Sequence, residues 1–490
     1  MSSFENYEQV DVVIIGAGIS GIGAAAWMAK QFPERNYRII DANPSHGGTW
    51  WTHKYPGVRT DSDMQTYGYA DHPWLGKTFA SAQQIMDYMQ GVMDECAITE
   101  KIVFNRTVTN ARWFDGLNQW VLTIYNKETG AREYVRTPFL WNCAGYYSHD
   151  LPYRPHWEGE EEFHGTIVHS QEWPENLDYA GKRVVVIGSG ATAATVIPAF
   201  AETAEHVTML QRSPTYFQSK PSIEPLKAML DPLDLDPKIK HEILRRHFIR
   251  NIEIGVNMVH NENEKLTGMF LEAVRQQLPE GFDMKHFTPR YPAWKQRVAA
   301  VPDGDMFQWV RDGKASVVTD TIDRFTAEGV QVSSGEVLAA DIIVVATGFN
   351  MNVLGEISFE VNGRKIDTHR HVTWRGVMIE GLPNMVYHFG YFRATWTLRI
   401  ELVNQFVGRL WRFMEEHGYR KVFPKREGEN EDDNRPWVSA DYVDPGYMMR
   451  ALPYLFQQGK DEAWRHFYEY KDEIKILPNV DLAEQHLRYA

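Results

Sequence analysis

Residues 12–21 read Val-Val-Ile-Ile-Gly-Ala-Gly-Ile-Ser-Gly, and the fold class can be inferred from them. Its four apolar residues predict a strand that is buried on both faces of a parallel sheet. Gly16, Gly18 and Gly21 follow at the spacing G-x-G-x-x-G, and an Ala-rich stretch to about residue 30 predicts a helix. These glycines permit a tight turn, a close backbone approach to a pyrophosphate, and close packing of the helix on the strand. The stretch therefore predicts a dinucleotide-binding unit with phosphates at the helix N-terminus.

Residues 184–193 repeat the pattern as Val-Val-Val-Ile-Gly-Ser-Gly-Ala-Thr-Ala, with an alanine in place of the third glycine, which the fingerprint permits. The repeat predicts a second nucleotide-binding unit in the same chain. The residues expected to contact the two nucleotides are Ser20 with the three glycines of the first turn, and Gly188, Ser189, Gly190, Thr192 and Ala193 of the second.

The residues that end the next strand of each unit separate the two ligands. Asp41 follows the predicted strand at 37–40 and can accept a hydrogen bond from a ribose 2′-hydroxyl, whereas it would repel a 2′-phosphate. Arg212 stands at the matching place of the second unit and is a cation suited to a 2′-phosphate. We therefore expect FAD in the first unit and NADPH in the second.

The bulk composition agrees with a large globular protein. The chain has 490 residues, of which 43% are hydrophobic and 24% charged, enough for two or three domains. Its net charge of -14 argues against nucleic acids and anionic membranes as main partners. Cys96 and Cys143 imply no disulfide framework, and no metal site is expected. Without a signal-peptide pattern or a membrane-spanning apolar run, the sequence predicts a cytoplasmic protein, either a monomer or a homodimer.

The order of these segments predicts an α/β fold with two Rossmann-like dinucleotide-binding domains and a helical insertion in the NADPH domain. The expected boundaries are 1–150 for the FAD-binding domain, completed by 380–490; 151–220 for the NADPH-binding domain, completed by 296–379; and 221–295 for the insertion.

A motif between the two units points to the chemistry. Phe163, Gly165, His169 and Trp173 stand at the spacing F-x-G-x-x-x-H-x-x-x-W, followed by Pro174. This segment resembles the long fingerprint of type I Baeyer–Villiger monooxygenases, which are class B flavoprotein monooxygenases. Related enzymes that oxygenate amines and sulfides usually carry Tyr or Phe where Trp173 stands. The resemblance implies that His169 holds the two domains in register rather than acting as a general base.

Further segments carry the same resemblance along nearly the whole chain. Gly47 to Trp50, Asp61 and Tyr67 look like the flavin-contacting segment of the family, and residues 346–348 resemble its Ala-Thr-Gly motif. Segments 294–307 and 390–398 look most like the branch that includes the ethionamide-activating monooxygenases. The additional cofactor contacts implied are Gly48, Thr49, Trp50, Asp61, Tyr67, Val108, Thr347 and Gly348.

The resemblance implies a reaction in which FAD, reduced by NADPH, reacts with O2 to form a C4a-peroxyflavin. One oxygen atom then enters a small apolar ketone, giving an ester or lactone, and sulfides are also oxidised. A cation beside the flavin would stabilise the negative oxygen. Arg297 is the expected cation, with Lys295 as the alternative because the spacing departs from the family pattern. Asp61 is expected to orient the guanidinium.

Three alternative functions remain at the sequence level. The first is a flavin monooxygenase specialised for S- or N-oxygenation, with little activity on ketones. The second is a disulfide or quinone reductase with two dinucleotides, although Cys96 and Cys143 do not form the close redox pair that such enzymes carry. The third is a flavin-binding interaction protein without catalysis, which two intact nucleotide motifs disfavour.

Overall fold

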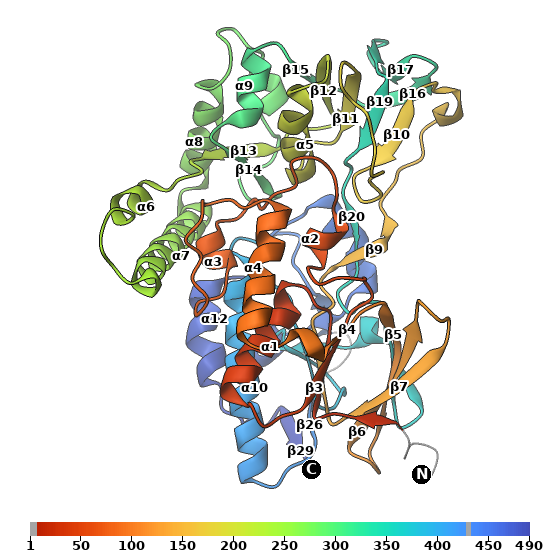
Figure 1. The fold of residues 1–490 in the computed structure, drawn as a ribbon, viewed down its shortest axis with the longest axis vertical. Coiled ribbons are helices and arrows are strands. Elements are labelled where there is room, and N and C mark those ends of the chain that lie inside the picture. The colour runs from red at the N-terminus through yellow and green to blue at the C-terminus, as the bar shows by residue number, and fades with distance from the viewer. Residues whose placement is uncertain (1–6, 428–432) are drawn as a thin grey trace.

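The computed structural model describes residues 7–427 and 433–490, which form two units along the longest axis of the molecule (Figure 1). The N-terminal glycine turn lies in the lower unit of that view and the second glycine turn in the upper one. Within these residues, no helix is both long and apolar enough to cross a membrane.

The first unit is built on a five-stranded parallel sheet with the order β25-β8-β2-β3-β4. Helix α1 packs against both α4 and α10 beside this sheet. Because β2 is fully buried, its all-apolar sequence matches its surroundings. The bounds are β2 Val12–Ile15, β3 Tyr37–Ile40, β4 Ile102–Val103, β8 Phe139–Asn142, β25 Met385–Tyr387, α1 Ile19–Gln31, α4 Ala82–Glu95 and α10 Trp396–Glu416.

A second sheet of this unit corrects one expected boundary. Strands β5 (Arg106–Phe114), β6 (Gln119–Asn126) and β7 (Arg132–Thr137) are antiparallel, and β21 (Ser358–Val361) extends them by pairing with β5. Segment 296–379 is expected from the sequence in the NADPH domain, but β21 and the following β22 (Arg364–Ile366) belong to this sheet. The reason is packing: Phe359 is buried against Trp120. The chain therefore returns to the first unit well before residue 380.

The second unit contains a five-stranded parallel sheet with the order β10-β19-β11-β12-β15. Helix α5 follows the second glycine turn, and a small antiparallel sheet of β16, β17 and β18 packs against the parallel sheet. The predicted α/β fold with two dinucleotide-binding units is confirmed. The bounds are β10 Thr166–His169, β11 Arg183–Ile187, β12 His206–Gln211, β15 Ala315–Thr319, β19 Ile342–Val345, α5 Ala191–Ala201, β16 Ile322–Thr326, β17 Gly329–Val332 and β18 Val337–Ala339.

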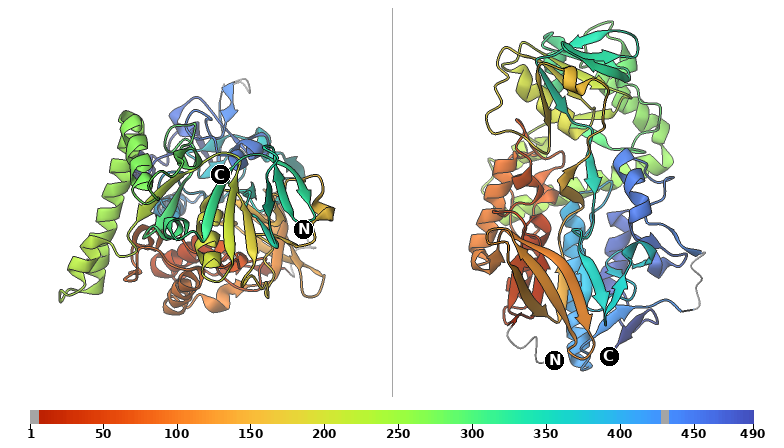
Figure 2. Two further views of the ribbon diagram at one scale, coloured as in Figure 1. Left: turned by 90° about the horizontal axis from the view of Figure 1, so that it is seen from above. Right: turned by 90° about the vertical axis from the view of Figure 1, so that its right-hand side faces the viewer.

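Helices fill the segment between β13 (Tyr216–Lys220) and β14 (Val298–Pro302), which pair with each other. Figure 2 shows these helices projecting to one side of the molecule. They are α6 Pro225–Leu230, α7 Pro237–Asn261 and α8 Asn263–Arg275.

Helix α7 is anchored on the first unit through a buried guanidinium. The Arg245 Nη1 atom donates to the carbonyl oxygens of Gln65 and Gly68, each at 3.1 Å. Its Nη2 atom contacts both carboxylate oxygens of Glu401 at 2.8 and 2.7 Å. The insertion is therefore joined to the first unit as well as to the second, from which its chain emerges.

Candidate active site

A cavity of about 1280 Å³ lies between the two units. It exceeds the range of roughly 300–1,000 Å³ that is typical of sites for one drug-sized ligand. Both glycine turns line it, so nucleotides bound to the two units would share one space. The expected site residues that line it are Gly16, Gly18, Ser20, Asp41, Gly48, Thr49, Trp50, Asp61, Tyr67, Val108, Gly188, Ser189, Gly190, Thr192, Arg212, Arg297, Thr347 and Gly348.

The first glycine turn leaves no room for a side chain at Gly16 or at Gly21. Gly16 has a φ of +101°, and a Cβ added there would lie 2.5 Å from the carbonyl oxygen of Cys143. A Cβ on Gly21 would lie 1.9 Å from the carbonyl oxygen of Gly16, which explains why Gly21 packs inside the turn rather than lining the cavity. The backbone at this turn is thus open to close approach by a pyrophosphate, as the fingerprint requires.

Asp41 lies at the end of β3 and is 6% exposed. Its Oδ2 atom accepts from the Ala17 backbone nitrogen at 2.6 Å, and its Oδ1 atom accepts from that of Asn43 at 2.7 Å. Burial raises the pKa of Asp41, whereas these two backbone donors oppose that shift. A carboxylate has further lone pairs beyond the two used here. The side chain can therefore hold the turn in place and also accept hydrogen bonds from ribose hydroxyls.

The second turn has a similar backbone. Gly188 has a φ of +140°, and a Cβ there would lie 2.3 Å from the carbonyl oxygen of Ala346. Ser189 Oγ lies 2.9 Å from Thr215 Oγ1. Ala193 is fully buried in the core of the unit instead of lining the cavity. Arg212 is exposed at the cavity edge, and no partner for its side chain occurs among the described residues. It is thus available to an anionic ligand.

The expected flavin-contacting segment contains two short helices. Gly48 precedes α2 (Thr49–Thr52), and Tyr67 ends α3 (Met64–Tyr67). The Trp50 Nε1 atom donates to the Tyr67 hydroxyl at 2.8 Å, with the two rings edge to face. Trp396 Nε1 also donates to Ser20 Oγ at 2.8 Å. The first bond joins the two short helices of the segment, and the second ties α10 to the first glycine turn.

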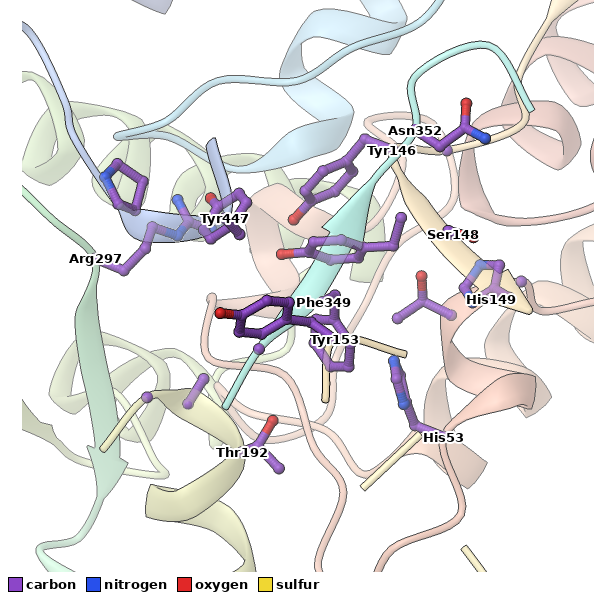
Figure 3. A pocket seen from close by; sticks show the side chains of 18 of the residues that line it. His53, Tyr146, Ser148, His149, Tyr153, Thr192, Arg297, Phe349, Asn352 and Tyr447 are labelled. Carbon is purple, nitrogen blue, oxygen red and sulfur yellow. The ribbon is translucent and has the colours of Figure 1, made fainter. Parts of the chain in front are cut away.

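Arg297 stands immediately before β14 and extends into the cavity (Figure 3). Its Nη1 atom donates to the carbonyl oxygen of Phe392 at 2.7 Å. Burial alone lowers the pKa of Arg297, but the electrostatic effects of Tyr447, Tyr146 and Asp61 outweigh it and raise that pKa overall. The guanidinium is therefore a permanent positive charge inside the site.

Lys295 lies elsewhere. Its Nζ atom donates to the carbonyl oxygens of Ala440 and Asp441 at 2.5 and 3.0 Å, and the residue does not line the cavity. Of the two cations that the sequence left open, the structure brings only Arg297 into the site.

Three tyrosines that were not expected from the sequence form part of an aromatic wall near Arg297, and Figure 3 shows two of them, Tyr146 and Tyr447. Tyr146 lies 4.0 Å from Tyr147 between ring centroids and stacks on Trp396 at 4.8 Å. Tyr447 comes from α11 (Gly446–Ala451), far along the chain. A signal existed for Tyr146 alone, because residues just beyond the carboxyl end of a parallel strand such as β8 commonly face a ligand.

The fingerprint residues Phe163, Gly165, His169 and Trp173 lie outside the cavity lining. His169 is 3% exposed, and its Nδ1 atom accepts from the Gln171 backbone nitrogen at 3.1 Å. The Nε2 atom therefore carries the proton and donates to the carbonyl oxygen of Tyr153 at 3.2 Å. The carbonyl oxygen of Tyr153 also accepts from Thr347 Oγ1 at 2.9 Å. These contacts give His169 a structural position at the junction of the two units.

The remaining fingerprint residues also pack at boundaries. The ring of Trp173 contacts Tyr55 of the first unit edge to face, at 6.4 Å between centroids. Phe163 contacts Phe325, and a Cβ on Gly165 would lie 2.4 Å from the carbonyl oxygen of Asp341. Packing thus explains why these three residue types occur at their positions, although none of them lines the cavity.

Comparison with known proteins identifies similar chains over nearly the whole length. A family profile described as flavin-binding monooxygenase-like matches residues 43–225, and one described as the Thi4 family matches residues 1–55. The chain is 39% identical over 486 residues to the FAD-containing monooxygenase EthA of Mycobacterium tuberculosis, covering 99% of this chain and 98% of that protein. It is 39% identical over 476 residues to the probable FAD-binding monooxygenase AlmA of Acinetobacter baylyi, covering 96% and 94%.

Solved structures share the fold at lower sequence identity. An oxidised steroid monooxygenase bound to NADP has a TM-score of 0.77 and 21% identity, covering 98% of this chain and 99% of that one. An open structure of cyclohexanone monooxygenase has a TM-score of 0.75 and 21% identity, covering 99% and 100%. At this identity the likeness concerns the architecture.

Proposed function

The chain belongs to the family of FAD-containing, flavin-binding monooxygenases, and from this membership we propose that it uses FAD and NADPH to place one oxygen atom of O2 into a small apolar ketone, giving an ester or lactone. The observation that carries the proposal is Arg297, a permanent cation that lines the cavity shared by the two glycine turns. A ketone becomes negatively charged at oxygen when it is attacked, and a fixed guanidinium stabilises such charge.

The protein's own residues divide the work around the cofactors. When it is bound and reduced by NADPH, FAD would supply the chemistry that activates O2. The turn at Gly16 and the carboxylate of Asp41 would hold the flavin nucleotide, while the turn at Gly188 and Arg212 would hold the nicotinamide nucleotide. Arg297 would supply the positive charge at the reacting oxygen. Asp61, whose charge acts on Arg297, would help to keep the guanidinium in place.

The cavity wall near Arg297 supports an apolar substrate. Large aromatic rings line it beside the guanidinium, and such walls both bind apolar molecules and exclude water. Sulfides could enter the same space, so sulfide oxidation is proposed as a secondary activity. The aromatic residues of this wall are Tyr146, Tyr147, Phe349, Phe389, Phe392, Trp396 and Tyr447.

Parallel turnover of an apolar ketone, an aryl sulfide and a carboxylate-bearing ketone tests the function. We expect the ester or lactone to be the main product from the neutral ketone, with nearly one product formed per NADPH consumed. Sulfoxide formed without ester would favour the S-oxygenating alternative. Preferential turnover of the charged ketone would contradict the apolar pocket, and NADPH oxidation that yields only hydrogen peroxide with every substrate would overturn the proposal.

Arg212→Ala tests the nicotinamide site. Because a hydrogen bond between charged groups contributes about 1.5–3 kcal/mol, the loss of Arg212 is expected to weaken NADPH binding roughly 10- to 100-fold. Because NADH lacks the 2′-phosphate, its dissociation constant should change no more than about twofold. The dissociation constants of both nucleotides are measured with the FAD-loaded protein.

Arg290→Ala is the matched control, because Arg290 is an exposed arginine of the same part of the chain and does not line the cavity. If the Arg212 variant loses affinity for NADPH and NADH equally, or binds both as before, another group binds the 2′-phosphate.

A further inference from the structure

The carboxyl ends of β12 and β15 bring two opposite charges to one edge of the cavity. These strands pair in parallel, with Gln211 opposite Thr319. The backbone nitrogen of Asp320 continues this pairing by donating to the carbonyl oxygen of Gln211 at 3.0 Å. Arg212 and Asp320 are therefore neighbours just beyond the last paired residues, and both line the cavity.

The carboxylate of Asp320 is fixed and ionised. Its Oδ1 atom accepts from the Thr321 backbone nitrogen at 2.7 Å, and its Oδ2 atom accepts from that of Ser334 at 3.1 Å. Hydrogen bonds from Ser334 and Thr321 lower the pKa of Asp320. No cation forms a salt bridge with this carboxylate among the described residues. Its negative charge therefore acts on whatever binds at this edge.

Few other charges are present on this side of the cavity. Among the described residues from 187 to 322 that line it, only Arg212, Arg297 and Asp320 are charged. Arg297 lies with Tyr447, in the part of the cavity that Figure 3 shows. Arg212 and Asp320 are thus the two charged lining residues at the ends of β12 and β15, and neutral hydroxyl groups line the cavity beside them. These hydroxyl groups belong to Ser189, Ser213, Thr215 and Thr321.

We propose that Asp320 is a specificity-determining residue, which opposes Arg212 and limits the preference of the site for NADPH over NADH. This inference rests on the proposed function of the second unit. A 2′-phosphate attracted by Arg212 is repelled by the neighbouring carboxylate, whereas a 2′-hydroxyl can donate a hydrogen bond to a carboxylate. Arg212 and Asp320 together therefore reduce the difference in binding affinity between NADPH and NADH, so that neither nucleotide is strongly preferred.

Asp320→Asn tests this assignment because it removes the charge and preserves the size of the side chain. Binding of NADP+ and NAD+ to the FAD-loaded protein is measured by calorimetry. We expect NADP+ to bind about three- to tenfold more tightly, the scale of an interaction between charges near a protein surface, while NAD+ changes less than about twofold. The gain should shrink between about 0.05 and 0.5 M salt, since salt screens repulsion between accessible charges.

Asp323→Asn is the matched control. Asp323 is exposed on β16, three residues further along, and does not line the cavity. The inference would be overturned if the Asp320 variant bound both nucleotides equally more tightly, or if its ratio of NADP+ to NAD+ affinity were unchanged. The same increase in NADP+ affinity in the Asp323 variant would also overturn it. If the unmodified protein binds neither nucleotide, the proposed function of the second unit fails and this inference with it. Unmodified protein that binds NADP+ and an Asp320 variant without any change would contradict the inference alone.

Discussion

Replacing Arg297 with Ala is expected to lower the rate of ester formation about 100- to 1,000-fold while FAD and NADPH remain bound. The guanidinium lies against the aromatic wall, held there by its bond to the carbonyl oxygen of Phe392. Its loss removes stabilisation of the negative oxygen that forms during the reaction, but it leaves both glycine turns intact. The expected signature is NADPH consumption that continues without ester.

The measurement compares ester yield, NADPH consumption and the flavin absorbance of the purified variants. Arg297→Lys keeps a positive charge but loses the planar guanidinium, so we expect only partial recovery of the rate. Lys295→Ala distinguishes the two cations that the sequence left open. If the Lys295 variant loses ester formation and the Arg297 variant does not, the assignment of the catalytic cation is wrong.

The nucleotide-binding units could be predicted because their signals are local. A buried strand, a glycine spacing and a helix follow one another within residues 12–31, and the steric reasons for Gly16 and Gly21 are visible in the turn itself. The same holds for residues 184–201. Local order along the chain was therefore sufficient for the fold class, which the structure confirms.

Long-range contacts explain what the sequence could not give. The short alternating segment 358–361 is compatible with either sheet, and only its pairing with β5 places it in the first unit. Arg245 resembles any charged residue of an exposed helix until Glu401 is brought to it from a position far along the chain. Tyr447 likewise reaches the cavity only because α11 folds back beside Arg297.

The ambiguity between Lys295 and Arg297 has a similar origin. The two residues are two positions apart, so spacing alone could not separate them. Their partners do: Lys295 binds backbone carbonyls of residues 440 and 441, whereas Arg297 binds that of Phe392 on the cavity wall. Both partners lie far from the cations in sequence, and therefore no local pattern could have made the choice.

Glu473→Gln is expected to cause the largest loss of stability, about 3–5 kcal/mol in the free energy of unfolding. Glu473 is fully buried on α12 (Tyr470–Ile476) and pairs with Arg399 of α10, whose side chain is 1% exposed. The Arg399 Nε atom lies 2.9 Å from one carboxylate oxygen, and the Tyr391 hydroxyl donates to the same oxygen. The substitution leaves the guanidinium charged and buried without its counter-ion, which costs far more than an exposed pair contributes.

Thermal unfolding with and without FAD measures this loss, and the midpoint should fall by roughly 3–5 °C. Glu242→Gln applies the same change to a glutamate paired with Arg246, whose side chains are 49% and 78% exposed, and should cost less than about 0.5 kcal/mol. Removing both buried charges in Arg399→Met/Glu473→Leu should recover stability relative to Glu473→Gln, because no unpaired charge remains. Equal midpoints for Glu473→Gln and Glu242→Gln would contradict a buried ion pair behind Tyr391. Recovery in the double variant would show that the loss in Glu473→Gln comes from the unpaired charge of Arg399, rather than from the changed shape of the carboxylate.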